Sequence, residues 1–161
     1  MSEANTVEAN TALARRWFEE VWNQGREETI DELFAANGLG HGLGDTDVTL
    51  RGPAEFKPFV RNLRGGLPDL HMTIEDLIAA GDKVTIRVTV EGTHKGGHLG
   101  VAPTGRRVRI EGLVVIRIAN GQIVDGWNSW DQLGLLRQIG ALPAHKGPDQ
   151  FTTARSSSTA G

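Results

Sequence analysis

Apolar side chains recur at helical spacing in the first third of the chain and at alternate positions from residue 70 onwards. The first pattern predicts a helix that ends at Asn-Gln-Gly, residues 23–25. Its apolar face would consist of Leu13, Trp17, Phe18, Val21 and Trp22. A short second helix is expected over residues 29–34. Pro53 suits the first turn of a third helix, whose buried stripe would be Phe56, Phe59, Val60 and Leu63.

Each alternating run predicts a strand with one buried face. We expect strands over residues 48–50, 70–79, 83–93, 106–118 and 123–131. The buried faces of the two longest would comprise Val84, Ile86, Val88 and Val90, and then Val108, Ile110, Val114, Ile116 and Ile118. Three helices followed by an antiparallel meander indicate an α+β fold. We expect a cone-shaped α+β barrel, in which a curved antiparallel sheet wraps the three N-terminal helices and leaves room for a small ligand.

Composition narrows the class of protein. At 161 residues and 39% hydrophobic, the chain fits one domain over residues 10–142, with flexible tails at 1–9 and 143–161. A net charge of −3 and scattered Lys and Arg argue against a nucleic-acid partner. The absence of cysteine excludes disulfides and thiolate chemistry, and the histidine spacing predicts no metal site. Without a signal peptide or a bilayer-length apolar run, we expect a cytoplasmic protein with no membrane partner.

Asp131 is the first candidate for chemistry. It closes a strand-like run that carries two tryptophans, and the apolar residues 133–139 follow it. If its carboxylate faced apolar side chains, desolvation would raise its pKa toward that of a general base. The alternative is that Asp131 caps a short helix, because aspartate at this position accepts orphan backbone N–H groups. One carboxylate can serve both purposes.

The register of the last hairpin decides which residues share a face with Asp131. A two-residue turn at Asn120-Gly121 would place Asp131 opposite Ile110, on the face of Val114. A three-residue turn with a bulge at Gly121 would place it with Arg109, Glu111, Leu113, Val115 and Arg117. We favour the bulge, because a polar pocket suits an oxygenated ligand, and there Glu111 would raise the pKa of Asp131 further.

Five segments together resemble one known family. They are residues 18–25 (FEEVWNQG), 68–70 (PDL), 92–94 (GTH), 100–106 (GVAPTGR) and 127–138 (WNSWDQLGLLRQ). In this order and spacing they resemble the SnoaL-like polyketide cyclases of the nuclear-transport-factor-2-like superfold, over roughly residues 10–142. The glycine-rich residues 37–44 depart from the family pattern and put one wall of the pocket in doubt.

The resemblance implies a cofactor-independent intramolecular aldol condensation on a hydrophobic polyketide-derived ester. In the family one aspartate of a Trp-x-x-x-Asp motif acts as acid and base, which here is Asp131 after Trp127. The superfold also hosts isomerases, epoxide hydrolases and binding proteins, so these stay as alternatives. For the hydrolase, Arg109, Glu111 and Asp131 would form the required trio. By analogy we expect a homodimer.

The remaining candidates are weighed one by one. His41, in the glycine-rich loop, either donates a hydrogen bond to a substrate carbonyl or is an ordinary surface residue. Arg87 either pairs with Glu91 or Glu111 or meets a substrate oxygen. Trp127 shares the face of Asp131 and is the best pocket wall, whereas Trp130 points to the opposite face and would serve a dimer interface. Further substrate contacts are assigned to Trp17, Phe59 and Arg117.

Overall fold

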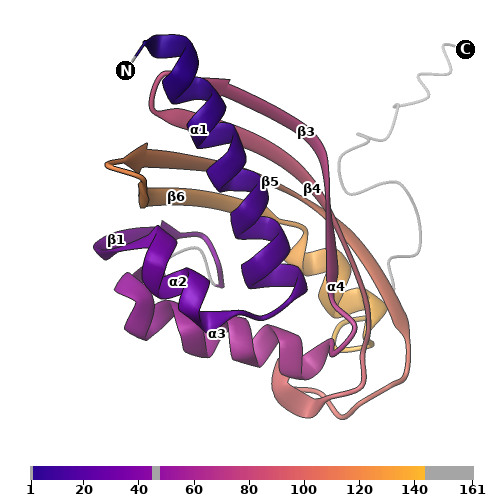
Figure 1. Ribbon diagram of the computed structural model, residues 1–161. Helices are drawn as coiled ribbons and strands as arrows, with labels where there is room; N and C mark the ends of the chain where they lie inside the picture. Colours follow the sequence, from indigo (N-terminus) through magenta and orange to yellow (C-terminus); the bar gives the residue numbers. More distant parts are fainter. Residues whose placement is uncertain (1, 45–47, 144–161) are drawn as a thin grey trace, which may run out of the picture.

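Helices pack on one face of a six-stranded sheet in the computed structural model, which describes residues 2–44 and 48–143 (Figure 1). The helices are α1 (Glu3–Arg16), the π-helical η1 (Trp17–Asn23), α2 (Glu27–Leu33), α3 (Gly52–Gly66), the 3₁₀ turn η2 (Gly97–Leu99) and α4 (Gln132–Gln138). The strands are β1 (Phe34–His41), β2 (Thr49–Arg51), β3 (His71–Ala80), β4 (Lys83–Thr93), β5 (Arg107–Ala119) and β6 (Gln122–Trp130). No helix in the described ranges has the length and apolar character needed to cross a bilayer.

The sheet is mixed and open, with the strand order β2-β1-β6-β5-β4-β3. The predicted antiparallel meander is confirmed for β3 to β6. The prediction of a loop in the glycine-rich residues 37–44 was wrong for residues 37–41, because they belong to β1, which runs parallel to β6. Glycine permits this strand: a Cβ at Gly38 would approach the Phe34 ring to 2.9 Å and the Ile123 carbonyl to 3.0 Å. The sheet therefore curves around the helices without closing into a barrel.

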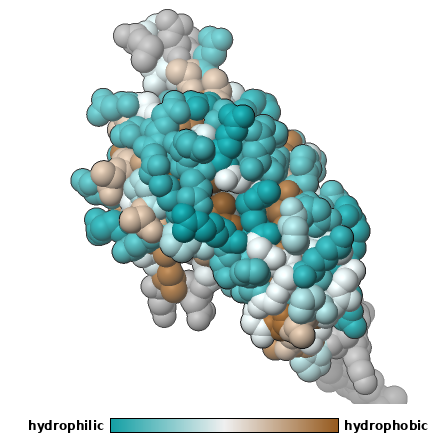
Figure 2. Space-filling model, turned by 60° about the horizontal axis from the view of Figure 1, so that its bottom comes forward, coloured by the Kyte–Doolittle hydropathy of each residue, from teal (hydrophilic) through white to brown (hydrophobic). Residues whose placement is uncertain are grey.

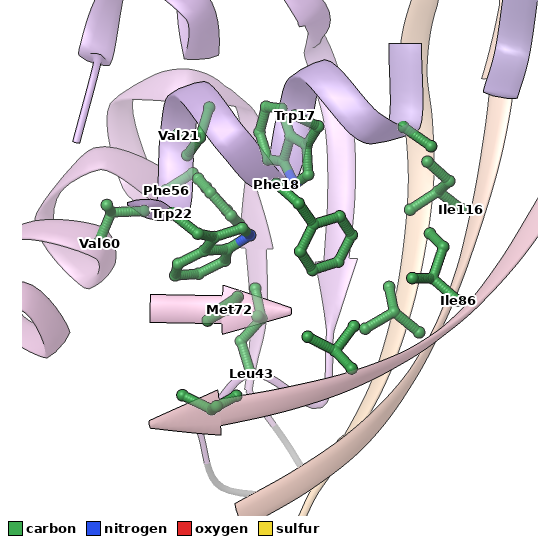
Figure 3. Packing of buried hydrophobic residues seen from close by; sticks show 14 of the residues in the cluster. Trp17, Phe18, Val21, Trp22, Leu43, Phe56, Val60, Met72, Ile86 and Ile116 are labelled. Carbon is green, nitrogen blue, oxygen red and sulfur yellow. The ribbon is translucent and has the colours of Figure 1, made fainter. Parts of the chain in front are cut away.

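The core lies between the helices and the concave face of the sheet, and we call the other face the outer face. The predicted buried positions of β4 and β5 are confirmed, since all of them are at most 7% exposed. Side chains of η1 and α3, including Trp17, Trp22 and Phe56, meet this face (Figure 3). Their rings pack at centroid distances of 5.2–6.5 Å with Phe34 and Phe59.

The N-terminal end of the chain differs from the predicted tail. Residues 3–9 belong to α1, so the prediction of a flexible tail over residues 1–9 was wrong for them. Asn10 is 6% exposed, and its side chain donates to the carbonyl of Gly81 at 3.2 Å, which fixes α1 over the β3–β4 turn. Of the predicted tail at 143–161, all but Pro143 lies outside the described residues.

The last hairpin combines a tight turn with a bulge further along. Asn120 and Gly121 have φ values of 52° and 71°, and Ala119 pairs with Gln122, as in a two-residue type I′ turn. The predicted bulge at Gly121 was therefore wrong. The register shifts between Arg117 and Ile118 instead, which leaves Val124 as the extra residue on β6.

Candidate ligand-binding cavity

A cavity of about 200 Å³ lies between the helices and the concave face, and we call it the main cavity. Its walls come from η1, α3, β3, β4, β5, β6 and α4, and almost every lining side chain is apolar. Among them are Trp22, Phe59, Met72, Val90, Ile110 and Trp130. On the face shown in Figure 2 the surface is mostly hydrophilic, with small apolar areas near its centre and at several places toward its outline. The apolar side chains thus gather inside, where they suit a hydrophobic ligand.

The π-helical turn η1 positions Trp22 in the wall. Gln24 N–H donates to the carbonyl of Glu19, five residues earlier, at 3.0 Å. The wider turn brings four of its side chains, Trp17, Phe18, Val21 and Trp22, to the buried side at once. Arg64 of α3 then donates to the carbonyl of Trp22 at 2.6 Å and fixes the end of the turn.

Helix α4 closes the main cavity from the other side. Its Leu135 and Leu136 line the cavity together with Gln132, one turn earlier. The side-chain amide of Gln132 donates to the carbonyl of Gly44, which links α4 to the segment after β1. Asp131 begins the helix, where Oδ1 accepts a hydrogen bond from Gly134 N–H at 2.8 Å.

A second, small cavity of about 20 Å³ also borders Trp22. Asn128 of β6 lines it, in a wall otherwise formed by aromatic and aliphatic side chains and two glycines. The Asn128 side-chain N–H donates to the carbonyl of His41 at 2.9 Å. Within residues 2–44 and 48–143, no carboxylate or imidazole lines either cavity, and no three His, Asp or Glu side chains gather as a metal site would require.

Comparison with known proteins identifies the family. A family model described as SnoaL-like polyketide cyclase matches residues 12–139. The aklanonic acid methyl ester cyclase DnrD of Streptomyces peucetius is 31% identical over 129 residues, which make up 80% of this chain and 88% of that protein. The chain belongs to the SnoaL-like polyketide cyclase family. The resemblance drawn from the five sequence segments is thereby confirmed.

Solved structures show the same fold. IdmH from Streptomyces antibioticus superimposes with a TM-score of 0.71 at 28% identity, over 81% of this chain and 98% of that one. A SnoaL-like protein from Jannaschia sp. CCS1 superimposes with a TM-score of 0.78, over 89% and 99% of the two chains, and at 23% identity it shows the fold alone.

The placement predicted for Asp131 in this SnoaL-like chain was wrong. Asp131 is exposed and faces the outer side of the sheet, where its backbone N–H donates to the carbonyl of Glu111. The shared face with Glu111 was predicted correctly, but that face is the solvent side and not the pocket. The capping alternative is the one that the structure shows.

Trp127 and His41 also lie on the outer side. Trp127 is 42% exposed and stacks on the His41 ring at 5.8 Å, so the prediction that Trp127 forms the pocket wall was wrong. His41 lies at the end of β1, with Nδ1 3.1 Å from Thr49 Oγ1 and Nε2 3.6 Å from Asp125. Arg117 pairs with Asp125 at 2.6 Å. None of these side chains lines either cavity: the bulge at Val124 turns Trp127 of β6 outward, while His41 and Arg117 lie on β1 and β5.

Arg87, Glu111 and Asp131 border an open groove of about 350 Å³ on the outer face. Arg87 forms an ion pair with Asp76 of β3 at 2.8 Å, and the hydrogen bond to that carboxylate raises the pKa of Arg87. The predicted partners, Glu91 and Glu111, were therefore wrong. Arg109 pairs with Glu91 at 3.2 Å, so the trio required for epoxide hydrolysis does not enclose a water site.

Two predicted ligand contacts do lie inside. Phe59 lines the main cavity and Trp17 lines the small one. Sequence reasoning missed Asn128 and Gln132 and assigned Trp130 to the wrong face. The position of Gln132 could have been predicted from the sequence, because it precedes Leu135 and Leu136 by three and four residues and so shares their helical face. Asn128 and Trp130 carry no such signal, since their orientation depends on the bulge.

Two of the family segments meet beside the main cavity. Asp69 accepts hydrogen bonds from Thr93 N–H at 2.6 Å and Thr93 Oγ1 at 2.7 Å. These bonds lower the pKa of the Asp69 carboxyl. The fully buried His94 accepts a hydrogen bond from Thr104 N–H and orders the loop that follows β4.

Proposed function

We propose that this SnoaL-like protein binds a polycyclic, polyketide-derived ester in the main cavity and closes a ring in it by intramolecular aldol addition. The observation that carries the proposal is the apolar, aromatic-walled cavity of about 200 Å³ in a member of this family. The relative DnrD, named for cyclisation of aklanonic acid methyl ester, supports the same substrate class.

The proposed aldol addition requires few reactive groups from the protein. A carbon between two carbonyl groups is acidic, because its carbanion delocalises onto oxygen. Once the proton leaves, the enolate carbon adds to a ketone carbonyl of the same molecule, and the resulting alkoxide takes up a proton. A cavity that holds the two reacting carbons in contact lowers the free-energy barrier of the ring closure by an amount on the order of several kcal/mol. Trp22, Phe59 and Trp130 provide flat walls for such folding.

The proton acceptor differs from the one first considered. Asp131 lies on the outer face, and the described lining holds no carboxylate or imidazole. In our proposal the proton therefore passes to water at the cavity mouth. The amide groups of Asn128 and Gln132 are neutral hydrogen-bonding groups and do not act as bases.

A second candidate function is binding without turnover. It is favoured by the same lack of a titratable group in the described lining. In that case the protein holds a polyketide in a folded conformation and leaves its bonds unchanged.

One experiment separates the two. Purified protein is incubated with aklanonic acid methyl ester, binding is measured by tryptophan fluorescence, and the cyclised product is measured by chromatography. Stereoselective product above the buffer rate supports the cyclase. Binding with product only at the buffer rate supports the binding protein, and absence of binding contradicts both. Leu135→Trp fills the main cavity and should abolish ligand binding under either function. Leu133→Trp, on the exposed side of the same helix, should leave ligand binding unchanged.

A further inference from the structure

The small cavity beside Trp22 exists because two glycines meet there. Gly40 of β1 and Gly126 of β6 are partners in register and leave no side chains at this point. Its volume of about 20 Å³ accommodates roughly one water-sized group. Trp22 borders this cavity and the main one, so the two cavities adjoin the same indole ring.

Three of the residues that line this small space carry a polar group without a partner in the described part of the chain. Asn128 uses one N–H for the His41 carbonyl, and its Oδ1 has no hydrogen-bond partner among the described residues. The indole N–H groups of Trp17 and Trp22 have none there either, although both residues are at most 5% exposed. The nitrogen of Trp22 points away from its own helix into the core (Figure 3). Among the described residues only His94 Nε2 is a fully buried side-chain nitrogen or oxygen without a partner, so these three polar atoms keep some accessible surface and can still take up a partner.

We propose that the small cavity is a subsite that anchors a hydroxyl or enol oxygen of the ligand, with Asn128 as its main partner. An O–H group can donate to Asn128 Oδ1 and accept from an indole N–H, so one oxygen satisfies two of the unpaired groups. A carbonyl oxygen or an ether can only accept, and a methyl group can do neither. The subsite therefore selects among ligands by their hydroxyl or enol groups, while the amide takes no proton.

This inference rests on the proposed function, because it requires the main cavity to hold a ligand ring. The test uses two probes of equal size, 2-naphthol and 2-methylnaphthalene, titrated into the full-length protein by calorimetry. We expect the wild type to bind 2-naphthol about tenfold more tightly, the discrimination typical of a hydrogen bond to a buried polar group.

Two variants locate that preference. Asn128→Leu should abolish it while 2-methylnaphthalene binds as before. Gly126→Ala should abolish it independently, because the added methyl group enters the small cavity with its nearest neighbour, Ile116, at 3.8 Å and therefore without a clash. Gln132→Leu removes the other amide of the lining and should leave the preference intact. Thermal melting confirms that each variant folds.

The outcomes separate the subsite from the cavity. If the wild type binds both probes equally, or if both Asn128→Leu and Gly126→Ala keep the tenfold preference, the subsite is refuted and the main cavity stands as a ligand site. If the wild type binds neither probe, the main cavity itself is refuted as a site for aromatic rings, and the subsite with it.

Discussion

Replacing Asp131 by asparagine and by alanine distinguishes its capping role from an acid/base role. Asparagine caps helices as well as aspartate does but cannot exchange a proton, whereas alanine does neither. Asp131→Ala removes the 2.8 Å hydrogen bond that Gly134 N–H donates to Asp131 Oδ1. Loss of an N-cap costs about 1 kcal/mol, which lowers the Tm of a chain of this size by about 2–4 °C.

The two roles predict opposite kinetics for Asp131→Asn. Because the side chain is exposed on the outer face, we expect this variant to keep the wild-type Tm and wild-type turnover of aklanonic acid methyl ester. Asp131→Ala should show the lower Tm and a modest loss of activity, since α4 carries Leu135 and Leu136 of the cavity wall. General acid/base catalysis contributes roughly 10²- to 10⁴-fold. A loss of turnover of that size in Asp131→Asn with an unchanged Tm would refute our reasoning and show that Asp131 acts as an acid or base in the reaction.

Three further predictions concern stability, the cavity and assembly. Because hydrogen bonds from Thr93 lower the pKa of Asp69, its stabilisation is present above the unfolded pKa of about 3.9 and is lost as pH falls through the folded value. The Tm difference between wild type and Asp69→Asn should therefore shrink below about pH 4 in a melting series. Val90→Phe places a ring in the main cavity and should weaken ligand binding about tenfold by calorimetry, with unaltered affinity as the contrary result. Leu113 and Trp127 are 55% and 42% exposed on the outer face, and we propose that this face forms a dimer interface. Sedimentation should show a dimer for the wild type and a monomer for Leu113→Glu. A monomeric wild type would exclude the proposed dimer.

The elements that a periodic pattern defines were predictable from the sequence. Val84 to Val90 and Val108 to Ile118 alternate without interruption, because each strand buries one face against the helices. β1 was not predictable in the same way. Its glycines lack strand propensity, and Gly38 and Gly40 are there because neighbouring backbone and side chains approach too closely for a Cβ.

Side-chain partners across the sheet were harder to predict than the strands themselves. Arg87 was expected to pair with a carboxylate of its own or the next strand, but register places Asp76 of β3 directly opposite it. Burial of Trp17 and partial burial of Phe59 followed from helical spacing alone. Which of the buried rings would border a cavity depended on how η1 and α3 pack, and a single sequence does not contain that information.

The bulge at Val124 decides what chemistry the interior can hold. In the register of the turn itself, Ala119 opposite Gln122, the strands would continue with Asp131 opposite Ile110 and hence on the concave face. The extra residue shifts the pairing by one, so that Trp130 lies opposite Gly112 and Asp131 continues next to Glu111. One inserted residue thus exchanges the two faces of β6, turning Trp127 and Asp131 to the solvent and Asn128 and Trp130 to the cavities. An ionised carboxylate in these apolar walls would carry a large desolvation cost, whereas an amide carries a smaller one that a ligand hydroxyl can offset. Under the proposed function, the family segment at residues 127–138 therefore fits an interior that holds and orients a ligand through neutral groups, and the reactivity comes from the bound compound itself.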